Sequence, residues 1–537
     1  MLEILDLKLP VDHPPEEIAA SVAVVLKAPH GEVLDIKVHR RAIDARRGRV
    51  FFIYTLHVTV RDEAAALANF RREMAKVQVY EERKYAELNG ILVREKPPAF
   101  RPVVVGTGPC GLFCALLLAR KGWKPVVLER GKAAGPRARD VTGFWRRGLE
   151  FNPDSNVQFG EGGAGTFSDG KLYTQIRDRE HRIPWILDEM VKAGAPEDIL
   201  LKARPHIGTD RLIKVVRRIR EEIQELGGEV RFECMMEELL LTDGRVSGVR
   251  LRGGEELVTD RVILAVGHSA RPTFEMLHRL GVEMEAKPLS IGVRVEHPQK
   301  LIDATQYGRW AGDEQLGAAP YKFVHHCRTG RAAYSFCMCP GGLVVAASSE
   351  PGGVVTNGMS SYARAEANAN SGFMVDVSPE DYGGSGPLAG IAFQRMWEQR
   401  AFAAGGGGYR APVQTIGDFL AGRNTKELGS VPSSYEPGVT PGDLRECLPP
   451  YVVSTLKEAI PAIERQLRGF ANPEGVLVGV ETRSSSPLRI NRDAETFESV
   501  STPGLFPAGE GAGYAGGIIS AAVDGMKVAE CILRRGA

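Results

Sequence analysis

Residues 103–129, VVVGTGPCGLFCALLLARKGWKPVVLE, decide the fold of this chain. Three valines lead into the turn GTGPCG at 106–111, an apolar helical segment follows, and a second apolar strand ends at Glu129. The order strand, G-x-G-x-x-G turn, helix, strand and acid is the fingerprint of a Rossmann-type dinucleotide-binding unit. A glycine-rich turn without a ligand is the alternative, and the complete βαβ context disfavours it.

Each part of this unit has a physical role. Gly106 permits the tight turn, Gly108 lets the backbone approach a pyrophosphate, and Gly111 lets helix and strand pack closely. Pro109 begins the helix, whose N-terminus then faces the phosphates. The carboxylate of Glu129 is placed to accept hydrogen bonds from both ribose hydroxyls of an adenosine. By itself, this fingerprint suits NAD and FAD equally.

Later segments favour FAD. The strand VSGVRL at 246–251 precedes the buried strand DRVILAVG at 260–267, and this order resembles the late part of the FAD domain in two-domain flavoproteins. The segment GLFPAGE at 504–510 resembles their C-terminal motif, in which an acid contacts the ribityl chain, although Glu510 stands where Asp is common. No second G-x-G-x-x-G lies in a βαβ unit, so NAD(P)H is expected at most as a transient donor.

A second glycine-rich stretch, GEGGAGTFSDGKL at 160–172, has five glycines among its 13 residues. Such a loop lets backbone N–H groups lie against a phosphate or a flavin. Ser168 and Lys171 would then point toward the active site, and Lys171 becomes a candidate for contacting flavin N5 or an anionic substrate. A surface turn is the alternative interpretation.

These motifs, taken together, resemble a bacterial family of uncharacterised FAD-dependent dehydrogenases, also called NAD(FAD)-utilising dehydrogenases, within the wider glutathione-reductase-like FAD superfamily. The resemblance covers nearly the whole chain. It implies tightly bound FAD, an inserted substrate domain and an N-terminal ferredoxin-like domain, and it indicates no substrate. The motifs that carry it are RAIDAR at 41–46, SNVQFGEGGAGTFSDGKL at 155–172, CMCPGG at 337–342, RAPVQ at 410–414 and PAGEGAGYAGGIISAAVD at 507–524.

The expected fold is α/β: a Rossmann-like FAD-binding domain with an inserted mixed α+β substrate domain, preceded by a ferredoxin-like α+β domain. In the first domain we expect two helices, the second at 61–79, and a possible last strand at 91–94. Later helices are expected at 452–468 and 518–533. The predicted boundaries are 1–97 for the ferredoxin-like domain, 98–290 and 471–537 for the FAD domain, and 291–470 for the insertion.

From these motifs we predict the residues that contact FAD and the candidates for catalysis. The catalytic candidates are Lys171, Arg410 and Arg483, the latter two as arginines able to bind a substrate carboxylate. The catalytic acid or base stays unknown. The predicted FAD contacts are Gly106, Gly108, Pro109, Gly111, Glu129, Arg130, Gly162, Gly163, Gly165, Ser168, Gly267, Gly509, Glu510, Gly516, Gly517 and Ile518; His268 is also expected near the cofactor.

Cysteines at 337 and 339 invite metal and redox interpretations. In a regular strand the two thiols would share one face, because side chains alternate. His325, His326 and Cys327 lie just upstream, but the spacing is not that of a usual zinc pair. We predict no metal site and interpret the two cysteines as small buried side chains, with thiol redox chemistry as an open alternative.

Composition excludes several classes of protein. A net charge of +1 and 25% charged residues give no global field for nucleic acid or anionic lipid, although six basic residues gather at 36–49. Eight cysteines are too few for a disulfide scaffold, and neither a signal peptide nor a membrane span is evident, so we expect a cytoplasmic protein. Glycine is in excess, with 61 of 537 residues against an average near ~7%.

The expected function is that of an FAD-dependent oxidoreductase, which transfers hydride between flavin N5 and a small-molecule substrate. One alternative within enzymes is a reductase of unsaturated, isoprenoid-like substrates. Another is a flavin-containing binding or sensing protein whose basic N-terminal domain engages a macromolecule. Nucleic acid is an improbable partner because no RNA- or DNA-binding motif is present. The sequence does not indicate an oligomeric state.

Overall fold

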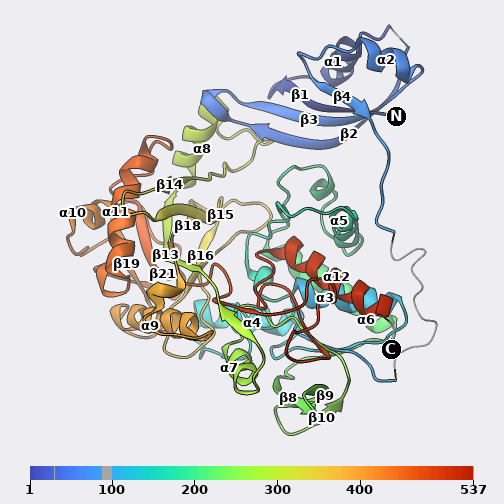
Figure 1. Cartoon of the computed structure of the whole chain (residues 1–537). Helices are drawn as coiled ribbons and strands as arrows, with labels where there is room; N and C mark the ends of the chain where they lie inside the picture. Colours follow the sequence, from blue (N-terminus) through green and yellow to red (C-terminus); the bar gives the residue numbers. More distant parts are fainter. Residues whose placement is uncertain (30, 87–98, 536–537) are drawn as a thin grey trace.

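A computed structural model describes residues 1–29, 31–86 and 99–535 (Figure 1). The possible strand at 91–94 and the domain boundary at 97 lie outside these residues. Figure 1 shows an N-terminal sheet above two larger parts, one built on a parallel sheet and one on a mixed sheet.

The N-terminal part is an antiparallel sheet of order β2-β3-β1-β4 with two helices. The predicted helix at 61–79 is wrong in its second half. Only Glu63–Asn69 is helical, because Phe70 is extended, and the alternating residues KVQV form a strand beside β1. The bounds are β1 Leu2–Pro10, α1 Glu16–Leu26, β2 Val33–Asp44, β3 Phe51–Val60, α2 Glu63–Asn69 and β4 Lys76–Val79.

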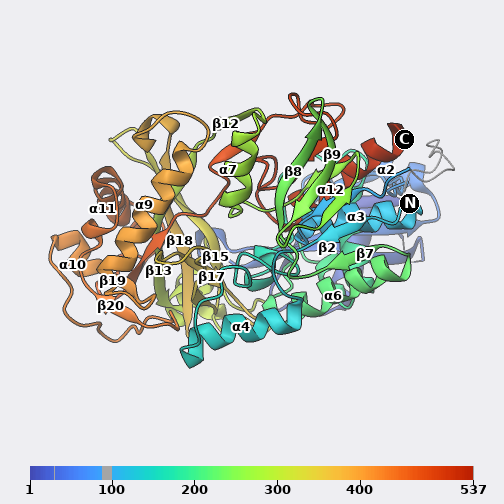
Figure 2. The same cartoon turned by 90° about the horizontal axis from the view of Figure 1, so that it is seen from below.

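The second part is a five-stranded parallel sheet of order β23-β11-β5-β6-β7. Each strand is short, and α3 and α12 pack together beside the sheet (Figures 1 and 2). They meet at Gly525, where an added Cβ would lie 2.1 Å from the Cys110 carbonyl oxygen. The bounds are β5 Val103–Val105, α3 Pro109–Arg120, β6 Val126–Leu128, β7 Glu229–Arg231, β11 Val262–Leu264, β23 Leu505–Pro507 and α12 Ile518–Arg535.

Further elements complete this part. A three-stranded sheet of order β10-β9-β8 precedes β11, as the hairpin-then-strand pattern predicts. The glycine-rich stretch at 160–172 follows helix α4 in the chain. Helix α6 packs on α3. The bounds are α4 Ala134–Arg147, α5 Arg182–Lys192, α6 Thr209–Glu225, β8 Met236–Thr242, β9 Arg245–Leu251, β10 Glu256–Val258, α7 Arg271–Arg279, β12 Met284–Ala286 and β22 Leu488–Ile490.

The third part is a mixed seven-stranded sheet of order β14-β15-β18-β13-β21-β19-β20. The predicted boundary at 470 falls before β21, which pairs with β13 and β19 in this sheet, so the chain returns to the parallel sheet only after Glu481. The bounds are β13 Leu289–Pro298, α8 Gln299–Tyr307, β14 Val324–His326, β15 Ala332–Cys339, β16 Leu343–Ala346, β17 Thr356–Met359, β18 Asn368–Val377, α9 Ala389–Ala404, β19 Ala411–Thr415, α10 Ile416–Ala421, β20 Val439–Pro441, α11 Pro450–Glu464 and β21 Val476–Glu481.

The basic strand β2 docks on the body of the molecule. The Arg41 backbone N–H donates to Leu201 O at 2.7 Å, and Ala203 N–H donates to Arg41 O at 2.9 Å. The Arg40 guanidinium adds a bond to Ala203 O at 3.3 Å. Part of the basic stretch therefore meets the edge of the main body rather than solvent. Among the described residues, no helix combines the length and apolarity that a membrane span needs.

Candidate active site

A pocket opens where the carboxyl ends of the parallel strands meet the mixed sheet. Its walls include Val105 at the end of β5, Ala265 after β11 and Ala508 after β23. Phe336 lines it from β15 of the mixed sheet, and Asn357 lines it from β17, which pairs with β16 in a separate two-stranded sheet. In open α/β sheets this edge is where ligands bind, because loops and helix N-termini converge there.

Glycines shape the narrow part of the pocket into a cradle. An added Cβ at Gly106 would lie 2.4 Å from Ala265 O, and one at Gly163 would lie 3.0 Å from the Gly108 Cα. At Gly267 and Gly516 a Cβ would meet nothing within 4 Å, and at Gly517 it would meet only Ser520 Oγ at 4.0 Å, although all three line the pocket. The cavity therefore runs along bare backbone, which suits a long dinucleotide.

Two helix N-termini face the same pocket. Helix α3 begins at Pro109 behind Gly108, which makes no side-chain cap, and α12 begins at Ile518. Free backbone N–H groups and the positive end of the helix dipole favour negative charge at such positions. The donor set therefore fits a pyrophosphate at α3 and an electron-rich ring edge at α12.

Glu129 lines the pocket, but its carboxylate already accepts four hydrogen bonds from the chain. Thr107 donates its backbone N–H at 3.1 Å and its hydroxyl at 2.6 Å, while the N–H groups of Gly131 and Gly160 each donate at 2.9 Å. A carboxylate has about four acceptor positions. In this structure Glu129 thus links the two glycine loops. The sequence predicts a contact with the ribose for this residue and does not indicate the linking role.

Arg137 of α4 holds the second glycine loop and was missed by sequence reasoning. Its guanidinium is fully buried and donates to five backbone carbonyls, those of Asn156, Val157, Gly160, Glu161 and Gly163. Burial lowers the pKa of Arg137 to about 10. An arginine in a helix carries no local signal of this role, because its partners are main-chain atoms some twenty residues away.

Most predicted FAD contacts line the pocket, and three do not. Gly111 and Gly162 serve packing, since a Cβ at Gly111 would lie 1.9 Å from Gly106 O and one at Gly162 would lie 2.1 Å from Thr166 Oγ1. Gly509 faces Cys110. The predicted contacts that do line it are Gly106, Gly108, Pro109, Glu129, Arg130, Gly163, Gly165, Ser168, Gly267, Glu510, Gly516, Gly517 and Ile518, and His268 lines it as well.

The three catalytic candidates have different surroundings. Lys171 lines the pocket, with its Nζ 3.1 Å from Asp169 Oδ2 and 4.0 Å from Cys337 Sγ. Arg483 also lines it, but its guanidinium is bound by Glu398 at 3.0 and 2.9 Å and cannot grip a substrate carboxylate bidentately at the same time. Arg410 is exposed outside the pocket, where it donates to Thr440 Oγ1.

The Arg483 pair belongs to a buried ionic cluster that joins the two sheets. Glu398 of α9 accepts from Arg271 of α7 at 3.0 and 2.8 Å as well as from Arg483. Burial raises the pKa of Glu398, but the two guanidinium groups outweigh it and hold the pKa far below the ordinary range. The cluster fixes the wall of the pocket next to His268, whose pKa burial lowers to about 3.

Asp524 supports the C-terminal motif. Its carboxylate accepts from the Gly509 N–H at 2.7 Å and pairs with Arg492 at 2.6 and 2.9 Å. The turn that places Glu510 in the pocket is thereby fixed to α12. Burial raises the pKa of Glu510 to about 7, so this carboxyl is partly protonated near neutrality.

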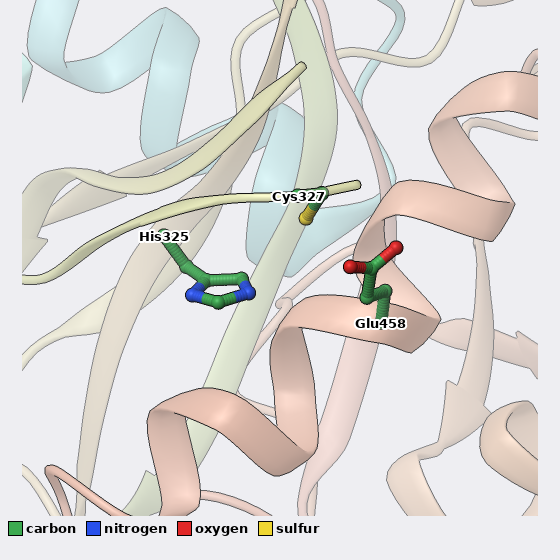
Figure 3. A group of neighbouring side chains, drawn as sticks. All are labelled: His325, Cys327 and Glu458. Carbon is green, nitrogen blue, oxygen red and sulfur yellow. The ribbon is translucent and has the colours of Figure 1, made fainter. Parts of the chain in front are cut away.

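The cysteines and histidines at 325–339 separate into two groups. His325 and Cys327 face Glu458 of α11, and their ligand atoms all lie within 4.8 Å of one another (Figure 3). This nitrogen, sulfur and oxygen set is one that zinc accepts. Cys337 and Cys339 lie elsewhere. A bulge interrupts β15 between Phe336 and Cys339, so the expectation that the two thiols share one face is wrong. Cys337 lines the pocket.

Comparisons with known proteins agree with this site. Three family models match: "FAD-dependent protein, C-terminal domain-like" over 288–484, "NAD(P)-binding Rossmann-like domain" over 104–155 and "Domain of unknown function (DUF8436)" over 1–59.

Relatives and solved structures are also similar to this chain. An uncharacterised protein of Clostridium beijerinckii is 45% identical over 536 residues, 99% of each chain. Protein FixC of Escherichia coli is 26% identical over 227 residues, which cover 38% of this chain and 45% of FixC. The solved L-proline dehydrogenase of P. horikoshii aligns with 82% of this chain and 95% of its own, at 12% identity and a TM-score of 0.31.

Proposed function

Because the chain belongs to a family of FAD-dependent oxidoreductases, together with the uncharacterised Clostridium beijerinckii protein, we propose that it oxidises or reduces a small molecule bound between its two large sheets. FAD is the cofactor, and when bound it supplies hydride transfer at its N5 atom. The observation that carries the proposal is one pocket lined both by the glycine turn at 106–110 and by Phe336 and Cys337 of the mixed sheet, with Asn357 of β17 beside them.

The chain's own groups have distinct tasks in this proposal. The N-terminus of α3 binds the pyrophosphate, and that of α12 stabilises negative charge that develops on the cofactor ring. Arg137 and Glu129 keep the two glycine loops in place. Glu510, with a pKa raised to about 7, is a group able to hold or release a proton at the pocket wall.

We assign the parts of the chain accordingly. Residues 99–290 and 482–537 form a glutathione-reductase-like FAD domain, 291–481 form the substrate domain, and 1–86 form a ferredoxin-like domain. The glycine fingerprint and the C-terminal motif support the first assignment. NAD(P)H is proposed as a transient donor at most. The comparisons favour neither a sensing role nor an isoprenoid substrate.

The proposed partner is a small-molecule substrate, with nucleic acid not expected. All eight cysteines are free thiols, which supports a reducing compartment such as the cytoplasm.

Spectroscopy of the purified protein tests this function. We expect a yellow protein whose flavin absorbance bleaches under anaerobic NADH or NADPH, or with one member of a metabolite panel, and returns with oxygen or a quinone. A protein that takes up FAD but is inert to every donor and acceptor would contradict it.

A further inference from the structure

Cys337 has a strained backbone at the wall of the active-site pocket. Its φ angle is +43°, a left-handed conformation that is unfavourable for a residue other than glycine. The strain coincides with the bulge in β15. Between the pairs Phe336–Gly372 and Cys339–Asn370, β15 advances by three residues while β18 advances by two. Strain of this kind persists where the surrounding structure demands it, and it gathers at functional sites.

The bulge brings the second cysteine back toward the first. The Sγ atom of Cys339, which is fully buried, lies 3.2 Å from the carbonyl oxygen of Cys337. The two thiols also interact with each other. Only Cys337 of the pair lines the pocket. One thiol therefore faces the cofactor space, and the other is buried two residues further along β15, outside the pocket lining.

The charged side chains around Cys337 carry a net positive charge, which favours a thiolate at this residue. Lys171 and Arg364 share a single carboxylate, that of Asp169, at 3.1 and 2.5 Å. Arg294, fully buried, pairs with Glu481 at 2.6 Å and donates to the Cys337 carbonyl at 2.9 Å. These groups carry three positive charges and at most two negative ones, because burial raises the pKa of Glu481 to about 7, and it does the same for the carboxyl of Glu510, which also faces Cys337. A thiolate at Cys337, 4.0 Å from the Lys171 ammonium, balances the cluster.

The proton therefore resides on Cys339. A hydrogen bond from the Cys339 thiol, opposed by burial and aided by Lys171 and Arg294, holds the pKa of Cys337 well below its usual range. The same hydrogen bond and burial raise the pKa of Cys339. Three carboxyl groups also face Cys337, namely Asp169, Glu481 and Glu510, and each opposes the thiolate.

We propose that Cys337 and Cys339 form a dithiol–disulfide couple in the wall of the pocket, with Lys171 as the positioning residue that keeps Cys337 a thiolate. Oxidation joins the two sulfur atoms in one S–S bond and releases two electrons and the Cys339 proton. Both electrons and the proton pass to bound, oxidised FAD, and the reverse step breaks the S–S bond. The inference rests on the proposed function only in taking FAD as the electron partner.

Thiol reactivity of the full-length holoprotein tests the thiolate. We expect iodoacetamide to alkylate Cys337 at least about tenfold faster at neutral pH than Cys234, which lines the same pocket but whose pKa burial raises. Lys171→Met should remove most of that difference, and Lys171→Arg should restore it. Equal rates at Cys337 and Cys234 in the wild type would overturn the proposal.

An anaerobic dithionite titration of the air-oxidised holoprotein tests the couple. The wild type should consume twice as many electrons per bound FAD as Cys339→Ser or Cys337→Ser, and peptide mapping should find the Cys337–Cys339 cross-link only in the wild type. Cys234→Ser is the matched control and should behave as the wild type. Equal consumption in all four proteins overturns the couple while leaving the oxidoreductase proposal intact, because substrate or NAD(P)H bleaching is measured separately.

Discussion

Individual buried charges, more than apolar contacts, position the backbone of the pocket. Arg137 donates hydrogen bonds to five carbonyls, Glu129 accepts four hydrogen bonds, and Glu398 binds two arginines at once. Buried charges are costly unless their partners are complete. Each of these residues is therefore a point at which one substitution should disturb the site without touching the cofactor.

Arg137→Met tests this at the residue scale. The variant leaves several buried carbonyls without donors, so we expect the unfolding free energy to fall by about 3 kcal/mol and the purified protein to lose FAD. Urea unfolding and the flavin content of the purified protein measure both effects. Arg139→Met, an exposed position on the same helix, is the control and should change neither. Full FAD content in Arg137→Met would contradict the anchoring role.

At the scale of elements, the glycine turn and helix α3 of the Rossmann unit pack so closely at position 111 that there is no space for a Cβ atom. A Cβ at Gly111 would lie 1.9 Å from Gly106 O, within the first turn of α3. Strand β5 has only three residues, so the turn has little freedom to move away. Close packing of the glycine turn against α3 therefore requires glycine at position 111.

Gly111→Ala should separate α3 from the turn and abolish FAD retention. Gly135→Ala adds the same methyl group in α4, where a Cβ meets nothing within 4 Å, and should leave FAD bound. Flavin content after gel filtration distinguishes them. Equal flavin content in the two variants would show that the turn accommodates a side chain.

At the scale of the whole molecule, the N-terminal sheet is tied to the body through the edge of β2. Ala203→Pro removes the N–H that donates to Arg41 O. We expect the radius of gyration from small-angle scattering to increase while FAD stays bound. Ala203→Ser keeps the N–H and is the control; an unchanged radius in both would mean that other contacts hold the sheet.

Buried histidines make the whole molecule sensitive to mild acid. Burial lowers the pKa of His206 and His297 to about 4 and that of His268 to about 3, from an ordinary 6.5. Because the folded pKa is depressed, their stabilisation is complete above pH 6.5 and is lost as the pH falls toward 4. The slope is about 1.4 kcal/mol per pH unit for each histidine.

Urea unfolding at a series of pH values between about 6.5 and 5 measures this slope. Two buried carboxyls, Glu481 and Glu510, oppose it, because their pKa values are raised to about 7 and their protonation in the folded state adds stability as the pH falls. The three histidines outnumber these two carboxyls, so the net slope keeps its sign. His297→Gln, in which the amide replaces the ring that donates to Phe470 O, should reduce the slope. A wild-type unfolding free energy that is constant over this interval would contradict the prediction.

The sequence by itself determined the Rossmann unit, the choice of FAD and most of the pocket lining. These follow from glycines and apolar strands whose spacing is local, so a short stretch such as 103–129 contains the physical requirement in full. Helix α12 was predicted for the same reason, from an apolar pattern behind a glycine turn.

Only the tertiary structure decided which side chains are already engaged. Arg483 and Arg410 look alike in the sequence, yet one is locked to Glu398 and the other lies outside the pocket. Residues 76–79 form β4 instead of helix because they pair with an edge of β1. Lys171 and Cys337 are 166 residues apart and meet only when the mixed sheet closes over the glycine loop. Long-range pairing of this kind depends on packing and charge balance across the fold, which no local pattern encodes.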